Sequence, residues 1–183
     1  MLSKNTIKLI RLLEQKKYRK QHNLFTIEGD KMINELINSH IDIKHIYTLS
    51  SELEHLAKKI HTAKLSIVNE KELSQISQLK TPNKSVALAE IPKINPKQVL
   101  NIELSIALDN LQDPGNLGTI IRTANWFGVK TIYCSSNSVD AYNPKVVQST
   151  MGAIFNTNVI YCDLKEIFTK ATNQQIPIYG TTL

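Results

Sequence analysis

The feature that most constrains the fold is a strand–helix–strand pattern in the second half of the chain. Apolar runs at Ile102–Leu108 and Val129–Cys134 predict two buried strands. The segment between them ends in Gly128, where a helix C-terminal glycine belongs, and its apolar positions have helical spacing: Leu117, Ile120, Ile121, Ala124 and Phe127. A helix that joins two strands of one sheet makes them parallel, with a right-handed crossover. We therefore expect an α/β fold with a parallel sheet.

The pattern continues on both sides of this unit. Downstream we expect a helix at Val146–Met151, a strand at Asn158–Tyr161, a helix at Leu164–Thr172 and a strand at Ile176–Tyr179. Upstream, strands and helices alternate over about 90 residues, with helix N-caps expected at Asp30, Ser51 and Asn69. This first block is long enough for a small three-layer α/β domain. We expect domains at 1–91 and 102–183, joined by a proline-containing linker at 92–101.

The positive charge is concentrated at the N-terminus. The chain carries a net charge of +6, and residues 1–31 account for +5 of it. Lys16, Lys17, Arg19 and Lys20 surround one tyrosine and are the expected RNA contacts. A dense positive field favours polyanions, because neutralised phosphates release counterions. A solvated basic helix is the alternative that charge alone leaves open.

Several classes of function lose support. The two cysteines lie far apart without a CxxC pattern, which argues against a zinc site and a disulfide framework, so we expect no metal. No apolar run is long enough to span a bilayer, and the N-terminus reads as an amphipathic helix, which predicts a cytoplasmic protein without membrane partners. Neither GxGxxG nor GxxxxGK[ST] occurs, so a dinucleotide-binding site and a P-loop lose their main support.

The turn before the central helix is the main candidate site. Asp113-Pro114-Gly115-Asn116 is a turn signature, with Asn116 the expected helix cap and Gly118 leaving the first turn open to close approach. A helix start suits an anion, and Arg122 offers a planar five-donor fork. An ordinary capped crossover helix with a surface arginine is the alternative. In residues 143–159, Thr150 and Gly152 could form a polar turn, although the residues alone favour a buried helix with a small-residue face.

These motifs resemble a known family. Asn116-Leu117-Gly118, Arg122 and Phe127-Gly128-Val129 are similar to the first signature of the SpoU/TrmH (SPOUT class) RNA 2′-O-ribose methyltransferases. Residues 145–153 resemble the segment that precedes the family's knot. Tyr18-Arg19 and Phe25–Gly29 resemble its ribosomal-protein-like substrate-binding domain.

The resemblance implies methyl transfer from S-adenosylmethionine to a ribose 2′-hydroxyl of structured RNA, with rRNA favoured over tRNA. It assigns Asn116 and Arg122 to catalysis, and Gly118, Thr150 and Gly152 to the surrounding pocket. The family's donor lies in a trefoil knot built from two later signatures that are absent here, which leaves Gly180 and Thr181 as donor-contact candidates. We therefore expect an incomplete α/β-knot domain and an inactive chain as given. Complete family members are expected to be homodimers.

The chemistry favours Arg122 as a clamp on a phosphate, because a guanidinium stays protonated and makes a poor base. Asn116 would orient the arginine or the ribose. Two further functions stay open: a non-enzymatic RNA-binding protein that uses the basic domain, and a nucleotide-binding α/β module unrelated to RNA.

Overall fold

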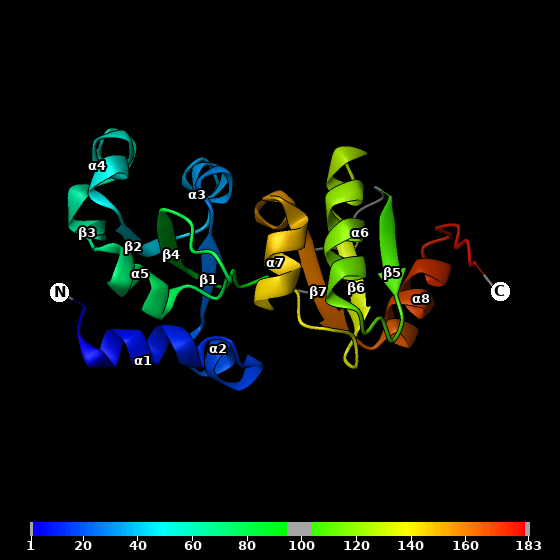
Figure 1. The fold of residues 1–183 in the computed structure, drawn as a ribbon. Coiled ribbons are helices and arrows are strands. Elements are labelled where there is room, and N and C mark those ends of the chain that lie inside the picture. The colour runs from blue at the N-terminus through cyan, green and yellow to red at the C-terminus, as the bar shows by residue number, and fades with distance from the viewer. Residues whose placement is uncertain (1, 95–103, 182–183) are drawn as a thin grey trace.

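A computed structural model describes residues 2–94 and 104–181, which form two lobes that lie side by side (Figure 1). The first lobe comprises residues 2–94, and the second comprises residues 104–181. Residues 95–101 of the expected linker lie outside the described residues, as do the first two residues of the expected strand at Ile102–Leu108.

The first lobe is built on a four-stranded mixed sheet in the order β1-β4-β2-β3. Strand β4 pairs antiparallel with β1 and β2, and β2 pairs parallel with β3. The strands are β1 (Leu24–Glu28), β2 (Ile43–Thr48), β3 (Leu65–Ile67) and β4 (Ser85–Glu90). The helices are α1 (Lys4–Leu12), α2 (Lys16–His22), α3 (Asp30–Ile37), α4 (Ser50–Ala57) and α5 (Glu70–Ile76), with a 3₁₀ turn at Thr62–Lys64.

Alternation along β4 divides the core of the first lobe. Ala87 and Ala89 face a cluster that includes α3 and α4, whereas Val86 and Leu88 face one that includes α1 and α5. Successive side chains on a strand point to opposite faces, so helices cover both sides of the sheet. The expected three-layer arrangement is confirmed.

The helix caps agree with the sequence at one position of three. Asn69 caps α5 in a capping box with Glu72, as predicted. The other two predictions are wrong: Gly29 precedes α3, so Asp30 is its first helical residue, and α4 starts at Ser50 without a side-chain cap. Helix α3 begins one residue earlier than its predicted cap indicated, and α4 begins two residues earlier.

The second lobe contains the expected parallel sheet, in the order β5-β6-β7. Its elements are β5 (Ser105–Leu108), α6 (Pro114–Trp126), β6 (Thr131–Ser135), α7 (Pro144–Thr150), a 3₁₀ turn at Ala153–Phe155, β7 (Asn158–Cys162) and α8 (Leu164–Asn173). Helices α6 and α7 pack on one face and α8 on the other. Gly128 takes the predicted left-handed position after α6, with φ of +76°. The α/β class with a parallel sheet is confirmed.

The strand predicted at Ile176–Tyr179 is wrong. Residues 176–181 have no regular structure, and Tyr179 is 92% exposed. The segment runs outward from α8 at the end of the molecule opposite the first lobe (Figure 1). An apolar run becomes a strand only where a neighbouring backbone pairs with it, and this segment pairs with none of the described strands.

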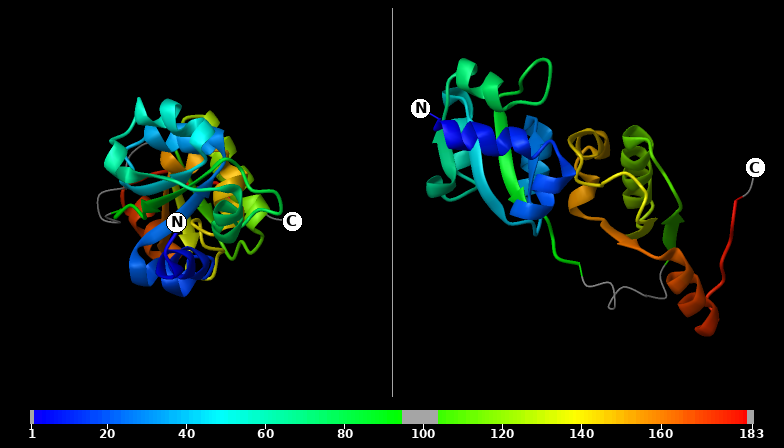
Figure 2. Two further views of the ribbon diagram at one scale, coloured as in Figure 1. Left: turned by 60° about the vertical axis from the view of Figure 1, so that its left-hand side comes forward. Right: turned by 90° about the horizontal axis from the view of Figure 1, so that it is seen from below.

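The two lobes share one buried apolar cluster. It runs from Phe25 and Ile27 on β1 to Val146 and Val147 on α7 and on to Ile132 in the second sheet. Strand β1 is the edge of its sheet, and α7 packs against it, between α6 and the first lobe (Figure 1 and Figure 2). Covering an edge strand with a helix removes a surface prone to unwanted pairing. The lobes therefore meet through packed side chains.

Candidate RNA-binding and catalytic site

The start of α6 is organised by Asp113 rather than by Asn116. The Asp113 carboxylate accepts a 2.7 Å hydrogen bond from the backbone N–H of Asn116, and Pro114 is the first helical residue. Proline suits this position because its fixed φ matches the helix and its missing N–H is not needed there. The prediction that Asn116 caps the helix is wrong, since Asn116 is the third helical residue.

Asn116 and Arg122 both lie exposed on α6. Six residues along an α-helix correspond to roughly 9 Å of rise and about 120° of rotation, so the two side chains leave the helix in different directions. Arg122 has no hydrogen bond or ion pair with any residue in the described ranges, so its five donors are free for a ligand. That the two residues share one pocket stays a prediction.

Gly118 provides close contact between helices. A Cβ at this position would lie 2.4 Å from the Cβ of Ser149 on α7. Thr150 is fully buried and donates its hydroxyl to the carbonyl of Val147. The buried helix with a small-residue face, which the residues alone favour, is confirmed, and the pocket role of Gly118 and Thr150 stays a prediction.

Gly152 lies where α7 approaches the first lobe. Its φ is +97°, and a Cβ there would lie 2.9 Å from the Glu35 side chain on α3. Both the backbone conformation and the space therefore require glycine. Its predicted place in a pocket stays a prediction, and its observed contact is between the lobes.

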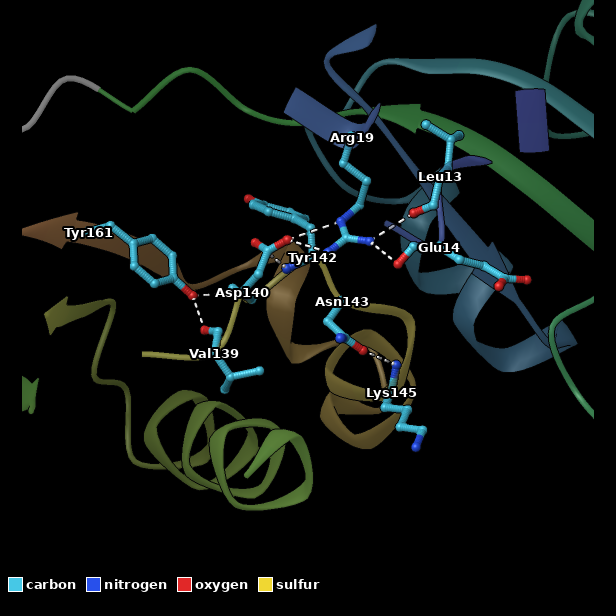
Figure 3. A network of polar contacts seen from close by, with 10 residues as sticks. Leu13, Glu14, Arg19, Val139, Asp140, Tyr142, Asn143, Lys145 and Tyr161 are labelled. Atoms are coloured by element: carbon cyan, nitrogen blue, oxygen red, sulfur yellow. Dashed lines mark hydrogen bonds and ion pairs between the residues drawn. The ribbon is translucent and has the colours of Figure 1, made fainter. Parts of the chain in front are cut away.

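Arg19 is buried between the lobes, with 2% of its surface exposed (Figure 3). Its Nε and Nη2 donate to Asp140 Oδ2 at 3.0 and 2.5 Å, and its Nη1 donates to the carbonyls of Leu13 and Glu14 at 2.8 Å. The sequence predicts Arg19 as an RNA contact, and this is wrong for the observed conformation. A buried guanidinium must be paired, and protein oxygens occupy its donors.

Tyrosines extend this contact on either side of Asp140. The Tyr161 hydroxyl donates to the carbonyl of Val139 and accepts from the N–H of Ala141 (Figure 3). The Tyr142 ring lies 4.8 Å from that of Phe25 on β1. Burial raises the pKa of both the Tyr142 and the Tyr161 phenol. These phenols stay neutral, and the loop before α7 is held against the first lobe.

The other predicted RNA contacts are accessible. Lys16, Lys17 and Lys20 are exposed on α2, with the Lys16 ammonium 5.6 Å from the Tyr161 ring centroid. A surface hollow of about 460 Å³ lies along α1, and its polar lining is Lys4, Lys8, Arg11 and Gln15. In the sequence, Lys4, Lys8 and Arg11 have the i, i+4 and i+7 spacing of one helix face. The sequence prediction named only the cluster on α2 and missed this signal. We name Lys4, Lys8, Arg11, Lys16, Lys17 and Lys20 the basic face.

A second cavity, of about 480 Å³, lies between the lobes. We name it the interlobe cavity. It is bounded by β1, the segment after α5, and the starts of α6 and α7, and its lining is Thr26, Glu28, Gln78, Leu79, Asp113, Pro114, Gly115, Pro144, Lys145, Val147, Gln148 and Ser149. Sequence reasoning missed it, because its walls come from four distant segments.

Glu28 is the buried carboxyl of the interlobe cavity. It accepts hydrogen bonds from Ser77 Oγ at 2.6 Å and from the Gln78 backbone N–H at 2.7 Å. Burial raises the pKa of the Glu28 carboxyl, and these two hydrogen bonds partly oppose the shift.

That Gly180 and Thr181 contact the methyl donor stays a prediction. Gly180 and Thr181 are exposed in the irregular segment after α8, and a Cβ on Gly180 would meet nothing within 4 Å. These residues alone do not fit around S-adenosylmethionine. Among the described residues, no group of three or more His, Cys, Asp or Glu side chains could hold a metal, and no helix is long and apolar enough to cross a membrane.

Comparisons with known proteins agree with this architecture. The SpoU rRNA Methylase family matches residues 103–183, and the MRM3-like substrate binding domain matches residues 4–87. The solved structure of a putative RNA methyltransferase of the TrmH family from Porphyromonas gingivalis is 32% identical, with a TM-score of 0.87 over 97% of this chain and 70% of that one. The chain belongs to the SpoU/TrmH family of RNA methyltransferases.

Two further relatives carry more specific names. The 23S rRNA (guanosine(2553)-2′-O)-methyltransferase RlmP of Bacillus subtilis is 28% identical over 93% of this chain and 67% of its own length. The AdoMet-bound rRNA methyltransferase from Sinorhizobium meliloti is 30% identical, with a TM-score of 0.80 over 92% of this chain and 66% of that one. The chain spans about two thirds of the length of each relative.

Proposed function

We propose that this SpoU/TrmH chain acts in the transfer of a methyl group from S-adenosylmethionine to a ribose 2′-hydroxyl of ribosomal RNA. The rRNA methyltransferases among its relatives support the substrate class. The observation that carries the proposal is the free guanidinium of Arg122 on α6, in a lobe packed directly against one that bears six exposed or groove-lining cations. We propose domain limits of 1–91 and 102–183, as the sequence indicates.

In this proposal the basic face holds the RNA backbone. Phosphate contacts fix the position and orientation of a nucleic acid but carry no sequence information. Arg122 binds a phosphate next to the target ribose and stabilises negative charge that develops at the 2′-oxygen. Asn116 orients the ribose by hydrogen bonds. Because Arg19 pairs with Asp140, it positions the first lobe instead of contacting RNA.

RNA binding tests the first part of the proposal. Affinity for an rRNA hairpin, measured by fluorescence anisotropy, should fall steeply with salt. Replacing Lys16, Lys17 and Lys20 by Gln should reduce the slope of log K against log salt by about three, roughly one for each phosphate contact. Gln at the exposed Lys130, Lys165 and Lys170 of the second lobe is the matched control and should leave the slope unchanged. Equal slopes for both triple variants would contradict the proposal.

Methyl transfer tests the second part. The natural protein that carries this sequence should transfer tritiated methyl groups from S-adenosylmethionine to an rRNA transcript. Asn116→Ala should lower the rate of transfer without changing RNA affinity more than a few-fold. A calorimetric titration of this chain with S-adenosylmethionine should show binding no tighter than about millimolar, because Gly180 and Thr181 are exposed and do not enclose a ligand. The homodimer and the cytoplasmic location stay predictions. RNA binding without any methyl transfer would favour the non-enzymatic alternative.

A further inference from the structure

The loop between β6 and α7, residues 136–143, is tied to helix α2 of the first lobe at two points. Asp140 in this loop accepts both hydrogen bonds from Arg19 on a single oxygen, Oδ2. The Lys16 ammonium, also on α2, lies 5.6 Å from the centroid of the Tyr161 ring. The Tyr161 hydroxyl in turn bonds the loop backbone on either side of Asp140 (Figure 3). The loop and α2 therefore form one connected unit.

The same loop also holds the segment that leads into α6. The Val139 N–H donates to the carbonyl of Leu111 at 2.8 Å, and the Leu111 N–H donates to Ser138 Oγ at 3.1 Å. Gln112 Nε2 donates to the carbonyl of Asn137 at 2.7 Å. The residue that follows Gln112 is the N-cap of α6. One loop therefore contacts both the helix that carries half of the basic face and the entry to the proposed catalytic helix.

The link between α2 and the loop is rigid. The side chains of Arg19 and Asp140 are 2% and 15% exposed, and the remaining donor group of Arg19 bonds two backbone carbonyls of the first lobe. A guanidinium held by several hydrogen bonds keeps one geometry. Lys16, Lys17 and Lys20 lie within three residues of Arg19 on the same helix. A phosphate bound by these lysines therefore stands at a fixed distance from the loop.

We propose that Asp140 is a positioning residue for methyl transfer, because it fixes the distance between RNA held by α2 and the ribose presented to Arg122. The contacts run from α2 through Asp140 and the loop to the segment that starts α6. Geometry at a reacting centre is demanding, and a misplacement of about 1 Å caused far from the chemistry can cost roughly 100-fold in rate. The inference rests on the proposed function, because it assumes that RNA held by α2 is methylated.

Two substitutions in the natural protein that carries this sequence separate side-chain length from charge. Asp140→Glu keeps the charge but adds one methylene, which displaces α2 from the loop. Asp140→Asn keeps the length and supplies one oxygen for both bonds from Arg19. Asp140→Glu should lower kcat at least about tenfold and leave the KM for rRNA within about threefold, because the lysines of α2 are intact. Asp140→Asn should keep kcat within about threefold at temperatures well below its Tm. A purely structural role predicts instead that kcat follows the Tm of each variant.

Two further variants complete the kinetic test. Asn69→Ala removes the capping box of α5, far from the loop in the sequence, and should lower the Tm without changing kcat. Tyr161→Phe frees the loop backbone but keeps the ring beside Lys16, so it should lower kcat without changing the KM. It tests the proposal even where Asp140→Glu fails to fold. Wild-type kcat in a folded Asp140→Glu or Tyr161→Phe variant overturns the proposal.

Nuclear magnetic resonance of the ¹⁵N-labelled chain provides a readout besides activity. Asp140→Glu should shift the backbone resonances of Leu111 and Asn116, whose N–H groups bond Ser138 and the cap of α6. Shifts confined to residues 16–22 and 136–143 would overturn the proposal, because the displacement would not reach the catalytic helix. The two levels stay separable: a wild-type protein that transfers no methyl group refutes the proposed function, whereas transfer that is insensitive to Asp140→Glu refutes the positioning role alone.

Discussion

Replacing Asp140 by Asn tests the contact that joins the lobes. Asp140 accepts two hydrogen bonds from Arg19, and the two side chains are 15% and 2% exposed. Removing one partner of a fully buried ion pair costs roughly 3–5 kcal/mol. Asn keeps an oxygen acceptor, and Asp140 is partly hydrated, so we expect a loss of about 2 kcal/mol in unfolding free energy. For a chain of this size that corresponds to a fall in Tm of roughly 4–8 °C.

The measurement is thermal unfolding followed by circular dichroism, with hydrogen exchange as the local readout. Exchange should accelerate first in α2 and in the loop before α7, because Arg19 and Asp140 tie these segments together. The matched control is Glu54→Gln, which neutralises one carboxylate of the exposed Lys58–Glu54 pair and should leave the Tm unchanged. If Asp140→Asn shifts the Tm no more than this control does, the lobes are not held by the buried pair.

Three further changes probe packing, capping and charge. Gly118→Ala should lower the free energy of unfolding, measured with urea, by about 1–3 kcal/mol, because its Cβ would clash with Ser149. Thr119→Ala, on the exposed side of the helix, should be near neutral, and equal losses would contradict the contact between α6 and α7. Asn69→Ala should cost about 1 kcal/mol in the same assay through loss of the capping box, and Ser51→Ala should cost little. Because burial raises the folded-state pKa of Glu28 above 4.5, its contribution to stability is fully present below that pH and is lost as the pH rises through the folded pKa. Glu28→Gln should therefore gain unfolding free energy relative to wild type as the pH rises from about 4 to 7, and a pH-independent difference would show that the carboxyl is not desolvated.

The sequence predicts the local elements well, because their signals are local. Apolar spacing and Gly128 define the helix between two buried strands, and this connection alone requires the parallel sheet. The capping residues of α3, α4 and α6 were harder to place. Asp, Ser and Asn suit both an N-cap and the first helical turn, so only the backbone decides between the two positions.

What the sequence leaves open depends on contacts between distant segments. Arg19 looks like a member of a basic surface cluster, yet its partner Asp140 is 121 residues away. The apolar run at Ile176–Tyr179 resembles a strand but lacks a backbone to pair with among the described strands. The interlobe cavity combines β1, the segment after α5 and the starts of two helices, an arrangement that no local pattern reveals.

The central claim is that Arg122 acts in methyl transfer to ribosomal RNA. Ribose methylation of the ribosomal RNA in cells that produce this protein tests it most directly. The comparison is between cells whose chromosomal copy encodes Arg122→Lys, cells with the charge-conserving control Lys130→Arg, and wild type. Lysine keeps the charge but lacks the planar fork of donors, so one 2′-O-methylated rRNA nucleotide should lose its modification in Arg122→Lys and keep it in Lys130→Arg. Full methylation at every rRNA position in the Arg122→Lys cells would contradict the assignment of this arginine to the reaction.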